Sequence, residues 1–329
     1  ERIAPVIIKM GCFSRVETNG GAFEQVNLLY GENPNQAVRT FTKPFNEAGI
    51  KTHMLDRGLN ALRMFPVPAD VRRLMYKVKH AQGVDITRIF CGLNDVRNII
   101  PSIKYALEAG MTPQATLCIT TSPIHTAEYY ANIADQLIAA GAPEICLKDM
   151  AGVGQPAMLG KLTRMIKEKH PEVIIQYHGH SGPGLSMASI LEVCRNGADV
   201  IDTAIEPLSW GKVHPDVISV QSMLKNAGFD VFMMANNHVL DRGRRGMERT
   251  LDQMGDCPNM GAYRTPEDRA ERYPLIMEVQ GLRIAFFNCT YGCNGYQALP
   301  PTHVNLIDTA EIAADLRSIE DKQIDLRIM

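Results

Sequence analysis

Two stretches of this chain decide its fold: residues 144–152 read EICLKDMAG and residues 174–182 read IIQYHGHSG. Each begins with an apolar run of strand length and ends in polar residues and glycine. Similar apolar runs recur along the first two-thirds of the chain, and helical stretches fill the intervals between them. This alternation predicts parallel strands joined by helices, which is an α/β fold.

The strand-like runs predict a TIM-type (β/α)8 barrel. Their ends fall roughly 26 to 38 residues apart, about the length of one βα unit in such a barrel. A closed barrel of this type has eight strands, and we expect this one to be incomplete because it lacks its first strand. The seven expected strands are 13–17, 51–55, 86–90, 114–120, 144–148, 174–178 and 200–204.

Polar residues follow six of these strands, among them Arg57, Asn94 and Lys148. A single polar strand end is explained by a solvated loop. Six polar strand ends at the same edge of the sheet favour an active face instead, because barrel enzymes place their chemistry at the carboxyl ends of the strands. Helices between the strands are expected at 69–82, 95–109, 126–140 and 187–195.

The composition limits the class of protein. With a formal net charge of −2 over 329 residues, nothing in the chain favours nucleic acid as a partner. No apolar run is long enough to span a bilayer, and the start of the chain has no signal-peptide pattern. The eight cysteines form no CxxC pair, which is typical of reduced thiols and predicts a cytoplasmic protein.

His178 and His180 indicate a metal site at the mouth of the barrel. Residues i and i+2 of a strand share one face, so both imidazoles can reach one ion, although a lone buried histidine is more often a core residue. Lys148 ends the preceding strand. As an ammonium it cannot bind a cation, whereas a carbamate formed with CO2 could. The other reading is an ion pair with Asp149, and the residues alone leave both open.

These motifs together resemble the carboxyltransferase barrel of biotin-dependent enzymes. That family includes the carboxyltransferase domain of pyruvate carboxylase, the alpha subunit of oxaloacetate decarboxylase and the related transcarboxylase subunit. The resemblance covers about residues 1–228. The matching stretches, in order, are 17–23 (ETNGGAF), 55–60 (LDRGLN), 88–90 (RIF) with 93–95 (LND), 148–152 (KDMAG) and 178–182 (HGHSG).

The resemblance implies metal-dependent carboxyl transfer between carboxybiotin and a keto acid, with pyruvate or oxaloacetate as substrate. Lys148, as a carbamate, would bind zinc, manganese or cobalt together with His178 and His180. Arg57 would face the substrate carboxylate or enolate; its other reading is a surface pair with Asp56. The implied partners are a biotin carboxyl carrier protein or domain, and either a second copy of the chain or membrane decarboxylase subunits.

The sequence also departs from the family pattern. The family's fourth metal ligand, an aspartate, and a substrate-binding glutamine lie on the first strand, which we expect to be missing. The family's catalytic threonine follows the last strand, where residues 208–215 read LSWGKVHP and contain no threonine. Cys91 stands where relatives often have aspartate. We therefore expect impaired turnover.

The last third of the chain resembles a different family. Residues 228–231 (GFDV), 235–243 (ANNHVLDRG) and 281–286 (GLRIAF) are similar to the poly-gamma-glutamate and capsule synthesis family, which has a metallophosphatase-like fold. The resemblance spans about residues 222–329 and implies Asn237 and His238 as metal ligands. Their other reading is a helix N-cap followed by a surface histidine. Two ligands do not hold a dinuclear site, so we expect this segment to be inactive.

The two resemblances predict two domains, 1–228 and 229–329, joined within 224–231 (LKNAGFDV). Our hypothesis is that two unrelated reading frames were joined there, by recombination or by assembly of mixed DNA. A single long read spanning both segments in a natural genome would contradict an assembly artefact. The functional alternatives are thus carboxyl transfer, a capsule-synthesis metallophosphatase-like protein, and an inactive chimera of the two.

Overall fold

The computed structural model describes residues 3–227, 231–237, 239–279 and 281–329. The chain divides into two compact units. The first is Arg15–Ala227, and the second comprises the described parts of Arg2–Ser14 and Gly228–Met329. Each unit has apolar core residues of its own.

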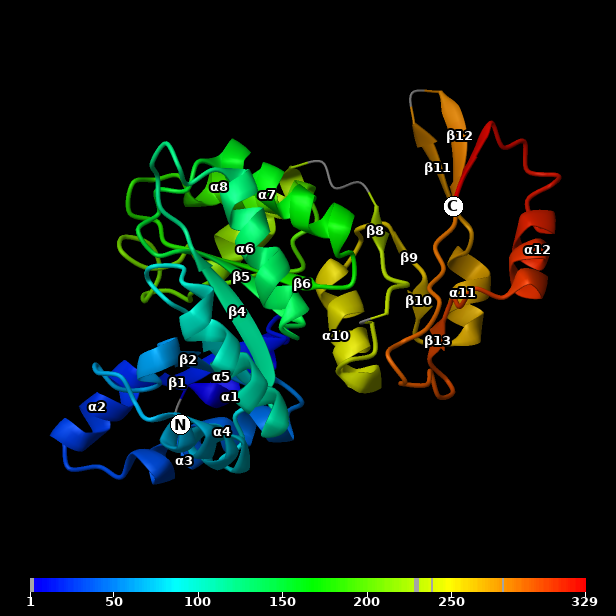
Figure 1. The fold of residues 1–329 in the computed structure, drawn as a ribbon. Helices are drawn as coiled ribbons and strands as arrows, with labels where there is room; N and C mark the ends of the chain where they lie inside the picture. The colour runs from blue at the N-terminus through cyan, green and yellow to red at the C-terminus, as the bar shows by residue number, and fades with distance from the viewer. Residues whose placement is uncertain (1–2, 228–230, 238, 280) are drawn as a thin grey trace. The chain divides into compact units, whose positions relative to one another are not determined.

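A seven-stranded parallel sheet forms the centre of the first unit (Figure 1). Its strands lie side by side in chain order, and each pairs in parallel with the next. Among the described residues, β1 and β7 are the two edges and do not pair with each other. The strands are β1 (Arg15–Gly20), β2 (Lys51–Asp56), β3 (Ile86–Ile89), β4 (Thr112–Cys118), β5 (Glu144–Asp149), β6 (Ile174–Gly179) and β7 (Val200–Ile201).

Helices connect these strands, and the four helices expected from the sequence are confirmed to within one residue at each end. Local signals explain their bounds: the Thr126 hydroxyl accepts the Tyr129 N–H at the start of one, and Gly141 ends it with a φ of 104°. The helical elements are α2 (Gly21–Leu29), α3 (Pro34–Glu47), the 3-10 turn η1 (Gly58–Asn60), α4 (Ala69–Ala81), α5 (Val96–Glu108), α6 (Ala127–Ala139), α7 (Pro156–Lys169), α8 (Ser186–Arg195) and α9 (Val217–Asn226).

The two faces of the sheet differ in chemistry. Apolar side chains such as Leu117 of β4 and Leu147 of β5 pack with Tyr130 of α6 in a buried core. Side chains alternate along a strand, so the residues between them point the other way. That other face carries buried polar residues, which include Arg88 and Lys148. The polar face positions the candidate site.

Three strands differ from their predicted bounds by two residues or more. β4 was expected at 114–120 but is Thr112–Cys118. β1 was expected at 13–17 but runs from Arg15 to Gly20. Gly20 pairs with Leu55, and a Cβ added to it would lie 3.1 Å from the Leu55 Cβ, so this close pairing favours glycine at the end of the strand. β7 was expected at 200–204 but ends at Ile201. Ala204 instead forms an isolated bridge with Asp216.

Three small sheets are found in the described residues of the second unit. This unit contains a hairpin in which Val279 pairs with Leu282 in an antiparallel ladder. Part of the strand expected at 229–234 lies outside the described residues. No described helix is both long and apolar enough to cross a membrane. The elements are α1 (Ala4–Met10), β8 (Phe232–Met233), α10 (Gly243–Met254), β9 (Asn259–Met260), β10 (Ala262–Tyr263), α11 (Pro266–Arg272), β11 (Leu275–Val279), β12 (Leu282–Phe286), β13 (His303–Val304), α12 (Thr309–Arg317) and β14 (Leu326–Ile328).

Candidate metal centre

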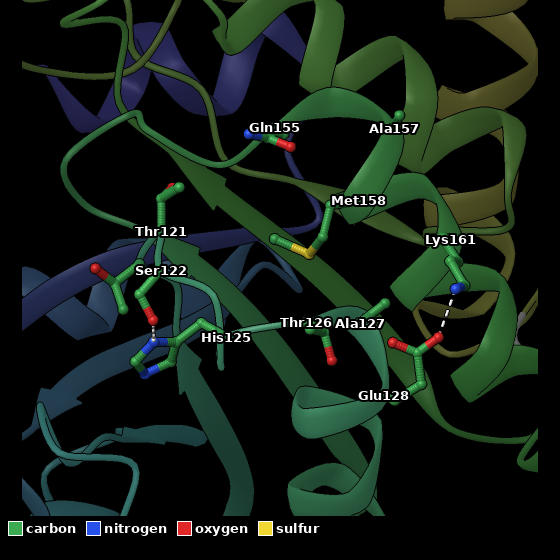
Figure 2. Close-up of a pocket in the computed structure, with 11 residues that line it drawn as sticks. Thr121, Ser122, His125, Thr126, Ala127, Glu128, Gln155, Ala157, Met158 and Lys161 are labelled. Carbon is green, nitrogen blue, oxygen red and sulfur yellow. Dashed lines mark hydrogen bonds and ion pairs between the residues drawn. The ribbon is translucent and has the colours of Figure 1, made fainter.

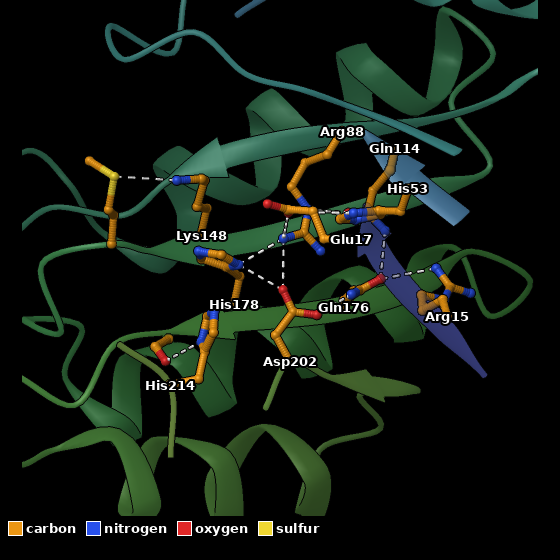
Figure 3. A network of polar contacts seen from close by, with 12 residues as sticks. Arg15, Glu17, His53, Arg88, Gln114, Lys148, Gln176, His178, Asp202 and His214 are labelled. Atoms are coloured by element: carbon orange, nitrogen blue, oxygen red, sulfur yellow. Dashed lines mark hydrogen bonds and ion pairs between the residues drawn. The ribbon is translucent and has the colours of Figure 1, made fainter. Parts of the chain in front are cut away.

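Lys148 and His178 are neighbours across the β5–β6 ladder. Their Cα atoms are register partners, so in a parallel pair their side chains leave the same face side by side (Figure 3). Gly179 follows His178, and a Cβ there would collide with the Tyr177 ring and hydroxyl. Tyr177 thus occupies the opposite face, which leaves His178 and His180 on the Lys148 side.

The two decisive stretches also contact each other after the strands end. The backbone N–H of His180 donates to the Asp149 carbonyl at 3.1 Å. Gly152 has a φ of 68°, and a Cβ there would lie 2.5 Å from the His180 carbonyl oxygen. Glycine at position 152 therefore allows the loop after β5 to approach the histidine motif closely.

The structure does not pair Lys148 with Asp149. The Asp149 carboxylate accepts the backbone N–H groups of Val153 and Gly154, both at 2.9 Å. Lys148 is 4% exposed, and its Nζ lies 3.4 Å from the Met150 sulfur and 5.2 Å from the centre of the Phe90 ring. No carboxylate of the described residues lies within 4 Å of that amine.

Asp202 fixes the imidazole of His178. Its Oδ2 lies 2.7 Å from both His178 Nδ1 and Arg88 Nη1, and Arg88 is completely buried. Burial raises the pKa of Asp202, but the Arg88 and His178 contacts outweigh burial and hold it well below its usual value. Two groups contact His178 Nδ1 at 2.7 Å: the Asp202 carboxylate, which accepts, and Arg88 Nη1, which donates. In the tautomer that donates to Asp202, the Nε2 lone pair is free to bind a ligand.

His214 joins the two predicted histidines. It follows β7 in the loop that leads to α9, and its Nδ1 lies 2.9 Å from the Gly179 carbonyl oxygen, which assigns the proton to that nitrogen. His178 Nε2 and His180 Nε2 are 3.2 Å apart. One ligand atom from each of the three rings lies within 4.8 Å of the others.

All three imidazoles are held in the neutral form that binds metals. Burial lowers the pKa of His178 well below its ordinary value, and the hydrogen bond to Asp202 only partly opposes this. Burial, reinforced by His214 and Lys148, lowers the pKa of His180 to about 4. Burial also lowers the pKa of His214. Their nitrogen lone pairs are therefore available at neutral pH.

The trio fits a divalent metal ion. Two ligands about 2.0 to 2.1 Å from a tetrahedral ion stand about 3.3 Å apart, close to the 3.2 Å between the nitrogens of His178 and His180. A carboxylate orients His178 and a backbone carbonyl orients His214, as expected around a metal-binding imidazole.

A chain of polar side chains supports Arg88 inside the barrel. Arg88 Nε donates to Gln114 Oε1 at 2.6 Å, and Gln114 Nε2 donates to Glu144 at 2.8 Å and to Gln176 at 2.7 Å. Gln176 in turn donates to Asp202. Arg15 Nη1 completes this network: it donates to Glu144 at 2.7 Å and to Gln176 at 2.9 Å, and the second contact is drawn in Figure 3. The position of His178 thus depends on residues from six of the seven strands or the segments that follow them.

Arg57 lies beside the start of α2 and is not paired with Asp56. Its Nη1 donates to the carbonyls of Leu62 at 3.2 Å and Arg63 at 3.3 Å. A Cβ on Gly21 would collide with this guanidinium, so the glycine at the start of α2 makes room for Arg57. Asp56 is buried and accepts hydrogen bonds from the Tyr76 and Thr87 hydroxyls instead.

A separate pocket of about 410 Å³ opens at the end of β4, beside the first residues of α6 and α7 (Figure 2). In it, Ser122 Oγ lies 2.6 Å from His125 Nδ1. Its two charged side chains, Lys161 and Glu128, form an ion pair with each other. None of the three clustered histidines lines it, so we do not assign the metal chemistry to this pocket.

The metal ligands expected in the second unit are not brought together by any described contact. Asn237 is half-buried, and its side-chain amide donates to Asn294 Oδ1 at 3.2 Å. His238 lies outside the described residues. The implied pair therefore remains a prediction.

Sequence reasoning missed Asp202, His214 and the role of Arg88. Asp202 stands in the predicted last strand, where alternation from Val200 would have placed it on one face with that residue. His214 lies in the stretch 208–215, where the comparison with the family pattern indicated only the absence of a threonine. No spacing signal links positions so far apart, because their contact depends on the curl of the sheet.

We expect Arg88→Met to destabilise the first unit by about 3 to 5 kcal/mol, because it leaves the buried Asp202 carboxylate without its cation. Arg97→Met is the matched control: the Arg97 side chain is 85% exposed and pairs with Asp95 on the surface, so its loss should cost less than about 1 kcal/mol. Urea unfolding of both variants measures this. Equal midpoints would contradict the role given to Arg88.

Asp56 should make stability depend on pH. Burial raises its pKa to about 6, against a value of about 3.9 in the unfolded chain. The folded state thus holds the proton more tightly, and the wild type loses stability as pH rises from about 4 to 6. Asp56→Asn cannot ionise, so it should gain about 1 to 3 kcal/mol relative to wild type over that range. Parallel unfolding curves at pH 4 and pH 7 test this; an unchanged difference would refute it.

Comparison with known proteins divides the chain in a similar way. Residues 90–208 match the family model described as HMGL-like, and residues 207–329 match that described as Bacterial capsule synthesis protein PGA_cap. The chain is 33% identical over 228 residues to a pyruvate carboxylase subunit of Methanothermobacter thermautotrophicus, covering 69% of this chain and 40% of that protein. It is 34% identical over 216 residues to the methylmalonyl-CoA carboxyltransferase 5S subunit of Propionibacterium freudenreichii subsp. shermanii, covering 65% and 42%.

Solved structures agree with these relatives. The carboxyl transferase domain of Rhizobium etli pyruvate carboxylase with pyruvate superposes with a TM-score of 0.62 at 27% identity, covering 65% of this chain and 37% of that one. The same domain with oxamate and biotin gives 0.64 at 27% identity, covering 68% and 39%. The present chain spans about two-fifths of the length of these relatives.

Both resemblances expected from the sequence are thereby confirmed. The seven parallel strands form a TIM-like carboxyltransferase fold, and the last third of the chain consists of small mixed sheets. At the level of distant homology, the first two-thirds of the chain are similar to the carboxyltransferase domains of biotin-dependent enzymes, and the remainder matches the capsule synthesis model.

Proposed function

We propose that the first unit carries out carboxyl transfer between biotin and a keto acid of the pyruvate/oxaloacetate type. The observation that carries this proposal is the placement of Lys148 beside His178 at the carboxyl ends of two adjacent barrel strands, with His180 in contact. The similarity to the pyruvate carboxylase relative supports the same substrate class.

Lys148, His178 and His180 would hold a divalent metal such as zinc, manganese or cobalt. The metal would supply Lewis-acid polarisation of the keto-acid carbonyl. Lys148 can serve as a ligand only after its neutral amine adds CO2 and loses a proton, forming an anionic carbamate. The amine is buried, contacts a thioether and an aromatic ring, and pairs with no carboxylate of the described residues.

Arg57 would bind the carboxylate of the keto acid. Two backbone carbonyls already hold its Nη1, so the planar guanidinium is oriented before substrate arrives. In the decarboxylating direction, the bond between the transferred carboxyl group and the substrate carbon breaks. The carboxyl group passes to the ureido nitrogen of biotin, and the proton displaced from that nitrogen ends on the substrate carbon. The family's threonine for this proton transfer has no counterpart in residues 208–215.

The proposed partners follow from the relatives. A biotin carboxyl carrier protein or domain would deliver the biotin, and a second copy of the chain or membrane decarboxylase subunits would complete the assembly. We also propose a domain boundary near residue 228. It is supported by the unit boundary after Ala227, whereas the family-model matches meet earlier in the chain, at 207–208.

The alternative function is that of the capsule synthesis family, favoured by the match over residues 207–329. In that reading Asn237 and His238 bind the metal, and the first unit has no catalytic part. The third reading, a chimera with neither activity, predicts no turnover by either unit.

Activity gives the direct test. The full chain with manganese, oxaloacetate and free biotin should form pyruvate at a rate that depends on biotin. Arg57→Met should lower kcat/KM about 10- to 100-fold, because a charged hydrogen bond to the substrate is lost. Arg97→Met, an exposed arginine, should leave the rate unchanged. A rate of pyruvate formation that does not depend on biotin and is unchanged in Arg57→Met would contradict the proposal.

The carbamate has its own test. Adding bicarbonate should tighten metal binding by the wild type at least tenfold, because an ammonium is converted into an anionic ligand, and should have no effect on Lys148→Ala. Isothermal titration with zinc in buffers with and without bicarbonate measures this. If both proteins respond alike, Lys148 is not the carbamylated ligand. If Asn237→Ala abolishes binding and Lys148→Ala does not, the metal belongs to the second unit.

A further inference from the structure

We infer that His214 is a metal ligand, so that three imidazoles hold the ion even before Lys148 is carbamylated. The inference rests on the metal centre of the proposed function and adds to it a residue from the loop after β7. Three observations carry it: the fixed backbone of that loop, the orientation of the His214 ring, and the charge balance of the site.

Backbone hydrogen bonds hold the chain on both sides of His214. The Ser181 N–H donates to the Val213 carbonyl at 2.9 Å, and the Ala204 N–H donates to the Pro215 carbonyl at 3.0 Å. The first bond ties His214 to the stretch that contains His180. The second ties it to the segment that follows Asp202. The position of His214 is therefore set by the same two segments that set the other imidazoles.

The ring of His214 is oriented toward the other two imidazoles. It meets His178 edge to face at a centroid distance of 4.4 Å and His180 at 4.9 Å. Because its Nδ1 proton is donated to the Gly179 carbonyl, its Nε2 carries the lone pair. This arrangement is the one in which a second group orients a metal-binding histidine. A surface histidine would show neither the carbonyl contact nor two imidazole neighbours.

The charges around the trio also favour a third neutral ligand. Arg88 pairs with Asp202 and Arg15 pairs with Glu144, so each cation is balanced by a carboxylate. Glu17 also lies 3.8 Å from Arg88. Lys148 has no carboxylate of the described residues within 4 Å, and as an ammonium it repels a divalent cation. Metal that enters before carbamylation thus needs ligands other than Lys148, and three neutral imidazoles form a common set for zinc and cobalt.

Cobalt titration in CO2-free buffer tests this directly, because the carbamate cannot form there. We expect one Co²⁺ to bind the full-length wild type, with visible absorption bands of a low-coordinate cobalt–imidazole site. His214→Ala should weaken binding at least tenfold and change the spectrum. Lys148→Ala should bind at least as tightly as wild type, since it removes a positive charge. The control His125→Ala removes an imidazole from the separate pocket and should bind normally.

A second variant separates the loss of a metal ligand from misfolding of the protein. His214→Gln retains an amide donor for the Gly179 carbonyl but lacks an imidazole, so it should melt like wild type and still lose affinity. Equal cobalt affinity and an equal spectrum in wild type and His214→Gln would overturn the inference, as would no cobalt binding by wild type. The protein could bind cobalt in a way that depends on His214 and yet show no biotin-dependent decarboxylation. That result would support His214 as a metal ligand and contradict the proposed reaction.

Discussion

The Asp202 carboxylate accepts hydrogen bonds from Arg88 and His178 in the interior of the barrel, and the geometry of the candidate site depends on this contact. A buried carboxylate is costly unless a cation pairs with it. Arg88 supplies that cation, and the polar chain through Gln114 and Gln176 holds both partners. The barrel therefore has a polar interior, and its apolar core lies on the other face of the sheet, against the helices.

This arrangement explains why the sheet can hold a reactive centre. Lys148 and His178 need only adjacent strands in register, which the ladder between β5 and β6 provides. Their chemistry needs more, namely a defined proton position on each imidazole and a low charge around the amine. The Gly179 carbonyl fixes the proton of His214, and Asp202 contacts Nδ1 of His178. The pairing of Arg88 and Arg15 with acids provides the second.

Much of the first unit was predictable because its signals are local. Strands of four to seven residues and helices that end at Gly110 or Gly141 follow from periodicity and capping. Helices α2, α3, α7 and α9 were not among the four expected: α2 begins at a glycine, and α3 contains Pro44. His178 and His180 were identifiable because they stand two positions apart at the end of one strand. Arg88, Asp202 and His214 were not, because Arg88 and Asp202 are 114 positions apart and only the curled sheet joins them.

In the proposed site, Lys148 couples the binding of CO2 to the binding of the metal ion. As an ammonium it opposes a divalent cation, and as a carbamate it attracts one, a change of two charge units at one position. Any process that favours the carbamate must therefore favour the metal, and metal binding must in turn favour the carbamate by the same factor. Three neutral imidazoles allow metal binding to begin, because they bind the ion while the lysine is still an ammonium that repels it. The site would then reach its full affinity only when CO2 and metal are both present.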